Sequence, residues 1–165
     1  MADQLLATVI TVSDEVFSGA DADRGGPVAA ELLSELGVAV ERKVVPDDGD
    51  RIEAAIRAAM TAGARFVMAC GGTGIGPKDR TPEVVARLLT FQMPGIAEEI
   101  RRLGIAHAKP ALVSREVAGA IVPEVGAPVF VLAAPGSRGG VRDALSVVGP
   151  ILDYVIEQLD GAGHR

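Results

Sequence analysis

Short apolar segments and amphipathic segments alternate along most of the chain. Apolar runs of strand length, and one segment with period-two alternation, predict strands over residues 5–12, 38–45, 66–70, 118–122 and 128–133. Apolar side chains at helical spacing predict helices over residues 27–36, 50–62, 82–91 and 94–103, and a helical region over residues 141–159 that Gly149-Pro150 interrupts. Residues 105–117 fit neither pattern.

The order of these elements predicts the fold class. Strands that alternate with helices are joined by right-handed crossovers into a mainly parallel sheet. We therefore expect a three-layer α/β fold with helices on both faces of the sheet. The charged positions within residues 38–45 indicate a half-exposed strand near an edge. No internal repeat or linker interrupts the sequence, so residues 1–165 are expected to form a single domain, with a frayed tail from residue 160.

Two of the predicted helices begin with capping signals. Asp50, with Glu53 three residues later, matches a capping box. Thr81 precedes a proline and an acidic residue, which predicts that Thr81 caps the helix that follows. The polar, glycine- and aspartate-rich residues 13–26 are expected to form a loop.

The composition excludes several classes of function. A formal net charge of −6 without a basic cluster argues against non-specific nucleic-acid binding. No apolar run reaches the length of a membrane span and no signal peptide precedes the first strand, so we expect a cytoplasmic protein. The single cysteine, Cys70, excludes an intrachain disulfide, and the two histidines, His107 and His164, argue against a zinc site.

The segment between the predicted strand 66–70 and the next helix carries the clearest chemical signal. Residues 71–76 contain four glycines, and Lys78 and Asp79 follow. Glycines allow backbone N–H groups to approach an anion closely, and the helix N-terminus adds positive potential. Asp79 could hold a metal ion that bridges to the anion. The segment therefore suggests phosphate or nucleotide chemistry with Mg²⁺, with a flexible connector as the alternative.

The common phosphate-binding motifs do not match this segment. Pro77 stands where a P-loop requires lysine after its second glycine, and where a dinucleotide fingerprint requires its third glycine. A dinucleotide fingerprint also belongs to the first strand–helix turn, whereas this loop follows the third predicted strand.

The unusual loops all follow predicted strands. Ligands of parallel α/β sheets bind beyond the carboxyl ends of the strands. We therefore expect the loops to converge on one pocket. They are residues 13–26, 46–50, 71–81 and 135–140.

Several short motifs occur in the order seen in one known family. They are Ser13-Asp14, Pro46-Asp47, Gly71-Gly72-Thr73-Gly74 with Asp79, Thr81-Pro82-Glu83, Met93-Pro94-Gly95, Ser114-Arg115 and Pro135-Gly136-Ser137. Together they resemble the MogA/MoaB family of molybdenum-cofactor biosynthesis proteins over almost the whole chain. The resemblance implies a molybdopterin-binding fold, commonly a homotrimer, and contacts with other molybdenum-cofactor biosynthesis proteins. It also implies Mg²⁺-dependent transfer of AMP from ATP to the terminal phosphate of molybdopterin.

The resemblance assigns one group of residues to the nucleotide side. Asp47 and Asp79 match the acidic pair of the family and would hold Mg²⁺ against the ATP phosphates, with Asp48 as a rival for Asp47. Backbone N–H groups of the glycine loop would meet phosphate, and Thr73 would donate a hydroxyl or orient the loop. Asp14 would contact the nucleotide or close a turn. The nucleotide-binding set is Asp14, Gly71, Gly72, Thr73 and Gly74.

A second group would face the pterin and its terminal phosphate. It consists of Ser114, Arg115, Pro135, Gly136 and Ser137, with Arg115 as the permanent charge. Two departures from the family pattern put catalytic strength in doubt: Glu15 stands where arginine is frequent, and Ala133 stands where asparagine is frequent. The alternatives are a member of the fold that binds molybdopterin without catalysis, and a nucleotide-binding domain similar to that of CinA proteins.

Overall fold

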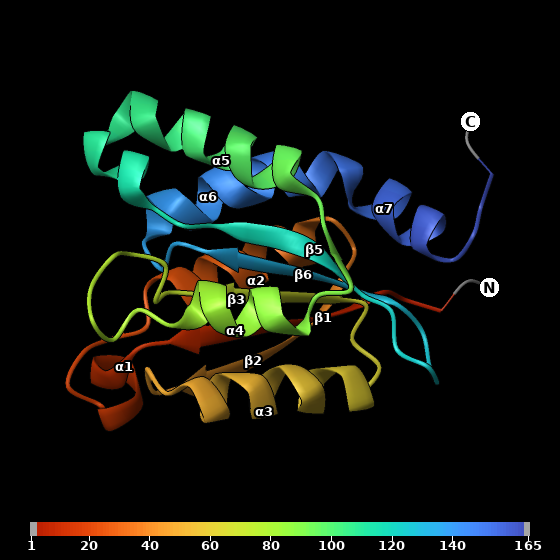
Figure 1. The fold of residues 1–165 in the computed structure, drawn as a ribbon, viewed down its shortest axis with the longest axis horizontal. Coiled ribbons are helices and arrows are strands. Elements are labelled where there is room, and N and C mark those ends of the chain that lie inside the picture. Colours follow the sequence, from red (N-terminus) through yellow and green to blue (C-terminus); the bar gives the residue numbers. More distant parts are fainter. Residues whose placement is uncertain (1–2, 164–165) are drawn as a thin grey trace.

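A computed structural model describes residues 3–163. Six strands form one mixed sheet in the order β2-β1-β3-β6-β5-β4 (Figure 1). They are β1 (Leu6–Val12), β2 (Ala39–Val45), β3 (Phe66–Cys70), β4 (Phe91–Gln92), β5 (Val117–Ile121) and β6 (Val129–Ala134). Strands β2, β1, β3 and β6 are parallel, whereas β5 is antiparallel to both of its neighbours. The predicted α/β class and the edge position of β2 are confirmed.

Helices cover both faces of the sheet. They are α1 (Asp14–Ser18), α2 (Gly25–Glu35), α3 (Gly49–Thr61), α4 (Thr81–Leu88), α5 (Pro94–His107), α6 (Arg138–Val148) and α7 (Leu152–Leu159), with 3₁₀ turns η1 (Lys109–Val113) and η2 (Gly149–Ile151). Helices α2, α5, α6 and α7 bury apolar side chains against one face, and α3 and α4 bury theirs against the other. Within residues 3–163, no helix is long and apolar enough to cross a bilayer.

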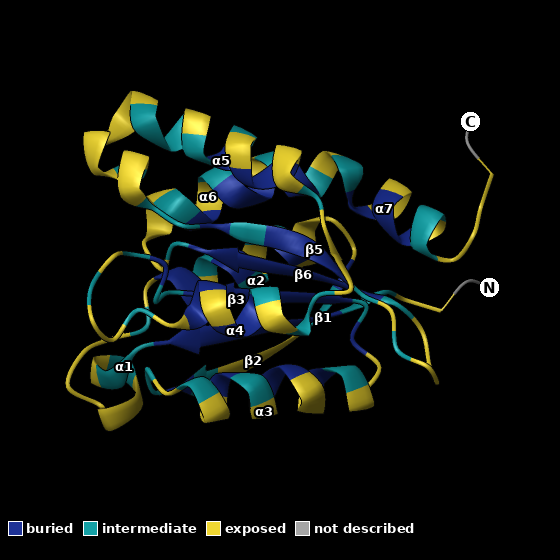
Figure 2. Cartoon of the chain, viewed as in Figure 1, coloured by how far each residue is buried: buried dark blue, intermediate teal, exposed yellow. Residues whose placement is uncertain are grey.

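The central strands are buried on both faces, which is why β3 and β6 are apolar throughout and β1 is apolar apart from the buried Thr8 and Thr11 (Figure 2). Phe66 and Phe130 are both fully buried on adjacent strands, with ring centroids 5.1 Å apart in an edge-to-face arrangement. In β2, by contrast, the three charged residues of the strand are exposed, in keeping with its place at the sheet edge.

The strand register brings four loops to the same edge of the sheet. Val12 is level with Val45, and Cys70 is level with Ala134. Because these strands are parallel, the segments that follow them all leave from one edge, as expected. The two described ends of the chain lie at the opposite edge (Figure 1). There Arg65 forms an ion pair with Asp160 at 2.6 Å.

Three local predictions are corrected by the structure. The loop over residues 13–26 contains α1, which Ser13 caps by accepting a hydrogen bond from the Val16 N–H, and which Gly19 ends in a left-handed conformation. Asp48, not Asp50, caps α3, because its carboxylate accepts the Arg51 N–H at 3.0 Å. Thr81 is the first residue of α4 and makes no capping bond.

The predicted helix over residues 82–91 ends early because a sheet edge competes for its backbone. Helix α4 ends at Leu88, and the Thr90 and Met93 N–H groups donate to carbonyls of β5 at 2.8 Å each. Phe91 and Gln92 thereby become β4. A Cβ on Gly119 of β5 would lie 2.2 Å from the Phe91 carbonyl oxygen, so this close pairing depends on glycine. The unassigned residues 105–117 form the end of α5, η1 and the start of β5.

Candidate functional site

Two aspartates meet where β1 and β2 end. The Asp14 N–H donates to Asp47 Oδ2 at 3.0 Å, and the Asp47 N–H donates to Asp14 Oδ1 at 2.9 Å. This reciprocal pair follows from the strand register, because each aspartate lies two residues beyond a paired strand end. Each carboxylate therefore fixes the backbone that carries the other.

The environments of the two carboxyl groups shift their pKa values in opposite directions. The Asp47 N–H and the Lys78 ammonium, 3.1 Å away, hold the pKa of Asp14 below its ordinary value. Burial raises the pKa of Asp47, and the negative charges of Asp14, Asp79 and Glu15 add to the effect. Asp47 is thus a carboxylate that would gain from a nearby cation.

The backbone at Gly71 and Gly72 lies so close to neighbouring atoms that a residue with a side chain would clash there. Gly71 has φ of 113°, and a Cβ there would lie 2.3 Å from the Val12 carbonyl oxygen. Gly72 has φ of 67°, and a Cβ there would lie 2.5 Å from Thr81 Oγ1 and 3.3 Å from Asp47 Oδ1. The loop therefore lies against the end of β1, the start of α4 and the Asp47 carboxylate.

The Asp79 carboxylate folds back over the same loop. Its Oδ2 accepts the Gly76 N–H at 2.8 Å, and a Cβ on Gly74 would lie 2.8 Å from that oxygen. The Asp79 N–H in turn donates to the Gly76 carbonyl at 3.1 Å. Asp47 and Asp79, which are distant in sequence, therefore lie on the same glycine loop.

The Arg115 guanidinium, which was expected to face the pterin side, lies on this loop. Its Nε donates to the Gly74 carbonyl at 2.8 Å and its NH2 group donates to the Asp79 carbonyl at 3.1 Å. Its NH1 group pairs with Glu83. Three acceptors from the loop and α4 explain the orientation, because they match the fixed fork of donors on arginine. Arg115 clamps the glycine loop.

Two threonines contribute to the loop, and Thr81 does so in a way that differs from its predicted role as a cap. Thr73 is 5% exposed, and its carbonyl accepts the Arg115 N–H at 2.8 Å, which favours an orienting role. Thr81 is fully buried below Gly72, and its hydroxyl has no hydrogen-bond partner among residues 3–163. The sequence suggested a cap at Thr81, so this hydroxyl was not recognised as part of the site.

A cavity of about 530 Å³ opens between α5, η1 and the first turn of α6. Three of the residues predicted for the pterin side, Ser114, Pro135 and Ser137, line it. Ser137 also caps α6 by accepting the Gly140 N–H at 3.0 Å. The full lining is Ile100, Gly104, His107, Ala108, Pro110, Ala111, Ser114, Glu116, Pro135, Ser137, Gly139, Gly140, Arg142 and Asp143. We call it the α5–α6 cavity.

A second cavity, of about 550 Å³, lies on the other side of the loop after β6 and shares Ser137 and Gly139 with the first. Gly136 lines this second cavity and packs against the glycine loop, because a Cβ on Gly136 would lie 3.2 Å from Gly71 Cα. Cys70 lines the second cavity, but burial raises the pKa of its thiol to about 12, so it is not a nucleophile.

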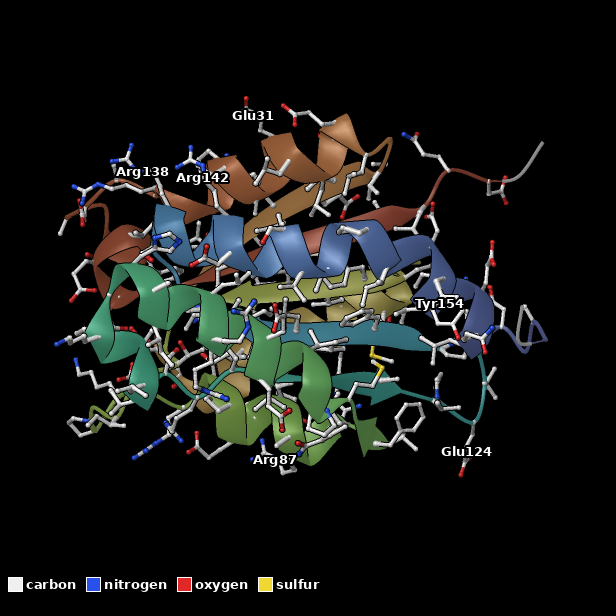
Figure 3. The ribbon with its side chains drawn as sticks, turned by 90° about the horizontal axis from the view of Figure 1, so that it is seen from above. Glu31, Arg87, Glu124, Arg138, Arg142 and Tyr154 are labelled. Atoms are coloured by element: carbon white, nitrogen blue, oxygen red, sulfur yellow. The ribbon has the colours of Figure 1, made fainter. Side chains whose placement is uncertain are left out.

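Two arginines that the sequence did not single out flank these cavities. Arg138 lines the second cavity and Arg142 lines the α5–α6 cavity, and both project from the start of α6 (Figure 3). Neither forms an ion pair with another described residue. Their charges and the N-terminus of α6 make the potential at this point positive.

The two departures from the family pattern have different consequences. Glu15 lies beside the acidic pair, where its carboxylate accepts the Ser13 hydroxyl at 3.2 Å and adds to the negative charge around Asp47. Ala133 is fully buried in the core between the sheet, α3 and α4. The side chain at position 133 therefore faces away from the α5–α6 cavity, whose walls lie on the opposite face of the sheet.

The comparisons with known proteins identify the family. Residues 8–154 match the family model described as a probable molybdopterin binding domain. The chain belongs to this family of molybdenum-cofactor biosynthesis proteins. It is 37% identical, over 161 residues, to a molybdenum cofactor biosynthesis bifunctional protein of Synechococcus elongatus, and this match covers 97% of the chain but only 49% of that relative.

Two further relatives resemble the chain along most of their own length. A molybdopterin adenylyltransferase of Pyrococcus furiosus is 34% identical over 140 residues, which cover 85% of this chain and 82% of the relative. The crystal structure of the tungsten cofactor synthesizing protein MoaB from Pyrococcus furiosus superposes with a TM-score of 0.88 at 27% identity, covering 96% of this chain and 99% of that one. The chain shares the fold of the MogA and MoaB proteins.

Proposed function

We propose that this protein transfers AMP from ATP to the terminal phosphate of molybdopterin, with release of pyrophosphate. The observation that carries the proposal is the position of Asp47 and Asp79 on the glycine loop. Nucleotidyl transfer depends mainly on positioning and on neutralising the charge of the phosphates. A loop with close-packed glycines next to two carboxylates suits a nucleotide that carries a divalent cation.

The two carboxylates could hold Mg²⁺ only together with ligand atoms from substrate and water. Among residues 3–163, no three histidine, cysteine, aspartate or glutamate side chains cluster as a complete metal site. Mg²⁺ is usually held by one or two carboxylates together with substrate phosphates and water. Burial raises the pKa of Asp47 and the nearby carboxylates add to the effect, so a cation at this point would be favourable. Asp47 and Asp79 would hold the ion, which would neutralise phosphate charge when bound.

The geometry supports a division of the site into two sides. Asp14, Gly71, Gly72, Thr73 and Gly74 would form the nucleotide side, with Asp14 fixing the backbone of Asp47. The structure also favours Asp47 over Asp48 as the second acid, because Asp48 is used as the cap of α3.

The molybdopterin side would be the α5–α6 cavity. Ser114, Pro135 and Ser137 line it, and Gly136 connects it to the glycine loop. The terminal phosphate would lie at the start of α6, near Arg138 and Arg142. The phosphate would then stand between the cavity and the nucleotide.

A direct assay tests the proposal. The protein is incubated with molybdopterin, labelled ATP and Mg²⁺, and adenylylated molybdopterin and pyrophosphate are measured. Both products are expected. Binding of molybdopterin without product would support the non-catalytic alternative, and binding of nucleotide without molybdopterin would support the CinA-like one.

We also propose a homotrimer, as the family resemblance implies. Exposed apolar side chains lie beside the glycine loop, where Ile75, Leu112 and Val113 are 73%, 64% and 49% exposed and line an open hollow. Apolar surface of this kind is commonly covered by association. Light scattering should give three times the mass of the chain, and a monomer at micromolar concentration would contradict the proposal.

A further inference from the structure

A buried carboxylate stands in the wall of the α5–α6 cavity. Glu116 immediately precedes β5, is 6% exposed as a residue and has a side chain that is 2% exposed. It lines the cavity. Ala118, two residues later, packs in the core between the sheet, α5 and α6. Since side chains two apart on a strand point to the same face, Glu116 points toward the layer in which the cavity lies.

This carboxylate lacks a complete set of partners. Glu116 Oε2 is buried and has no hydrogen bond among the described residues. A nitrogen of the Arg101 guanidinium lies 3.2 Å from it, but without the alignment of a hydrogen bond. The Arg101 Nε is turned to the Ser114 carbonyl, to which it donates at 2.8 Å. Buried carboxylates are costly unless they are both paired and hydrogen-bonded, so donors are missing at this position.

The cavity defines which donors could reach Glu116. Its walls are largely apolar, with Ile100, Ala108, Pro110 and Ala111 among them, and its volume suits a flat bicyclic ring. The start of α6, with Ser137 and Arg142, lines the same cavity and favours an anion. The cavity thus combines an acceptor for N–H groups, apolar walls and an anion-binding helix start.

We propose that Glu116 binds the N–H edge of a 2-amino-4-oxopterin ring in the α5–α6 cavity. The exocyclic 2-amino group and the adjacent ring N3–H of such a ring point in parallel, so they match the two oxygens of a carboxylate. A carboxylate selects strongly against a ring that presents an acceptor at position 2, because its buried oxygens would then face another oxygen. Glu116 would be the residue that sets specificity for the pterin. The inference takes the ligand class from the proposed function.

The test compares two free rings that differ at position 2. Pterin carries the 2-amino group, and lumazine carries a carbonyl oxygen there. Titration of the intact protein with each ring, followed by ring fluorescence, should show that pterin binds at least about tenfold more tightly. Glu116→Gln should reduce this preference to about threefold or less, because the amide offers one acceptor and one donor. Equal binding of both rings by the natural protein, or no pterin binding up to millimolar concentration, would overturn the proposal.

Control variants separate recognition from folding. Glu99→Gln removes an exposed partner of Arg102 outside the cavity and should leave the ring preference unchanged. Arg101→Lys tests whether Glu116 serves only as an ion-pair partner, and it should retain the preference for pterin. If Glu116→Gln lowers the melting temperature but keeps the full preference, Glu116 is structural and the proposal is wrong.

The ring experiment is independent of AMP transfer. A chain that prefers pterin through Glu116 but forms no adenylylated product would refute the proposed function and leave this inference standing. A chain that forms the product while Glu116→Gln keeps the full ring preference would do the reverse.

Discussion

The acidic loop side and the α5–α6 cavity are built in opposite ways. On the loop side, Asp14 and Asp47 hold each other's backbone, and Arg115 clamps the carbonyls of Gly74 and Asp79. In the cavity, apolar walls surround a carboxylate, Glu116, whose hydrogen bonds are incomplete. The loop side is preorganised before any ligand arrives, whereas the cavity needs a ligand to complete it. Under the proposed function, positioning of the reacting groups and recognition of the ring would thus be separated.

The largest expected effect is on the rate of AMP transfer when an acidic residue of the loop side is replaced. Asp79→Asn should lower the rate of AMP transfer at least about 100-fold, since it removes a carboxylate that would hold Mg²⁺. The affinity of the cavity for pterin should stay within about threefold. Rates of pyrophosphate release and ring titrations measure the two effects, and turnover equal to the natural protein would remove Asp79 from the site.

Asp47 and Asp48 provide a matched pair for the same experiment. Asp47→Asn should lower the rate of AMP transfer by about as much as Asp79→Asn does. Asp48→Asn keeps a residue that caps helices well, so both the rate and the stability should change little. If Asp48→Asn is the damaging substitution, the second acid has been placed one residue too early.

The next largest effect concerns the backbone of the loop. Gly71→Ala would place a Cβ 2.3 Å from a backbone carbonyl oxygen at a φ of 113°, so we expect a loss of about 2–4 kcal/mol in the free energy of unfolding. Gly63→Ala is the control, because φ there is 94° but nothing lies within 4 Å of the added Cβ. It should cost about 1–2 kcal/mol. Equal losses in urea denaturation would show that the close approach to β1 is unimportant.

Arg115→Ala should weaken ATP binding about tenfold, because the carbonyls of the loop lose their clamp. Pterin binding should change little. Arg115→Lys should rescue ATP binding only in part, since an ammonium does not reproduce the fork. Arg102→Ala, on the exposed face of α5, is the control. A loss confined to the pterin ligand would restore the role that the sequence suggested for Arg115.

A smaller effect is expected at the start of α6. Arg142→Ala should weaken the binding of molybdopterin about three- to tenfold and leave that of the unphosphorylated pterin ring unchanged, because only the phosphate would use this charge. The difference in molybdopterin affinity between Arg142→Ala and the natural protein should shrink as salt is added. A salt-independent loss would point to a packing role.

The smallest effect is a pH dependence of stability. The pKa of Asp47 is raised in the folded state, so the unfolded chain gives up this proton at lower pH. Stability due to this group is full below the ordinary aspartate pKa and falls as pH rises through the raised value. Asp47→Asn should therefore be slightly more stable than the natural protein at neutral pH, with no difference in acid. A difference that grows toward acid would contradict the shift.

The sequence was sufficient for the parts of the fold that depend on short-range pattern. Strands β1, β3 and β6 were predictable because both of their faces are buried, and α5 because its apolar stripe is regular. Strand β4 was not, since two exposed residues become a strand only because β5 offers carbonyls to their neighbours. The helix α1 was missed although Ser13 and Gly19 carry its cap signals, because five residues leave little periodicity.

The same distinction applies to the site. The glycines and Asp79 could be selected because residue type and loop position constrain their chemistry, whereas Asp47 was selected through the family resemblance. The direction of Arg115 could not, since it depends on carbonyls that are 36 and 41 residues away in sequence. Glu116 lies within residues 105–117, which the sequence pattern left unassigned, and only its burial beside a cavity draws attention to it.

The placement of the chain ends has a practical consequence. Both described ends lie at the edge of the sheet opposite the loops that follow β1, β2, β3 and β6 (Figure 1). A tag or an added domain at either end would therefore stand away from the glycine loop and the α5–α6 cavity. The molecule can be immobilised on a sensor surface through either end with the proposed ligand sites facing solution, which allows nucleotide and ring binding to be measured there as well.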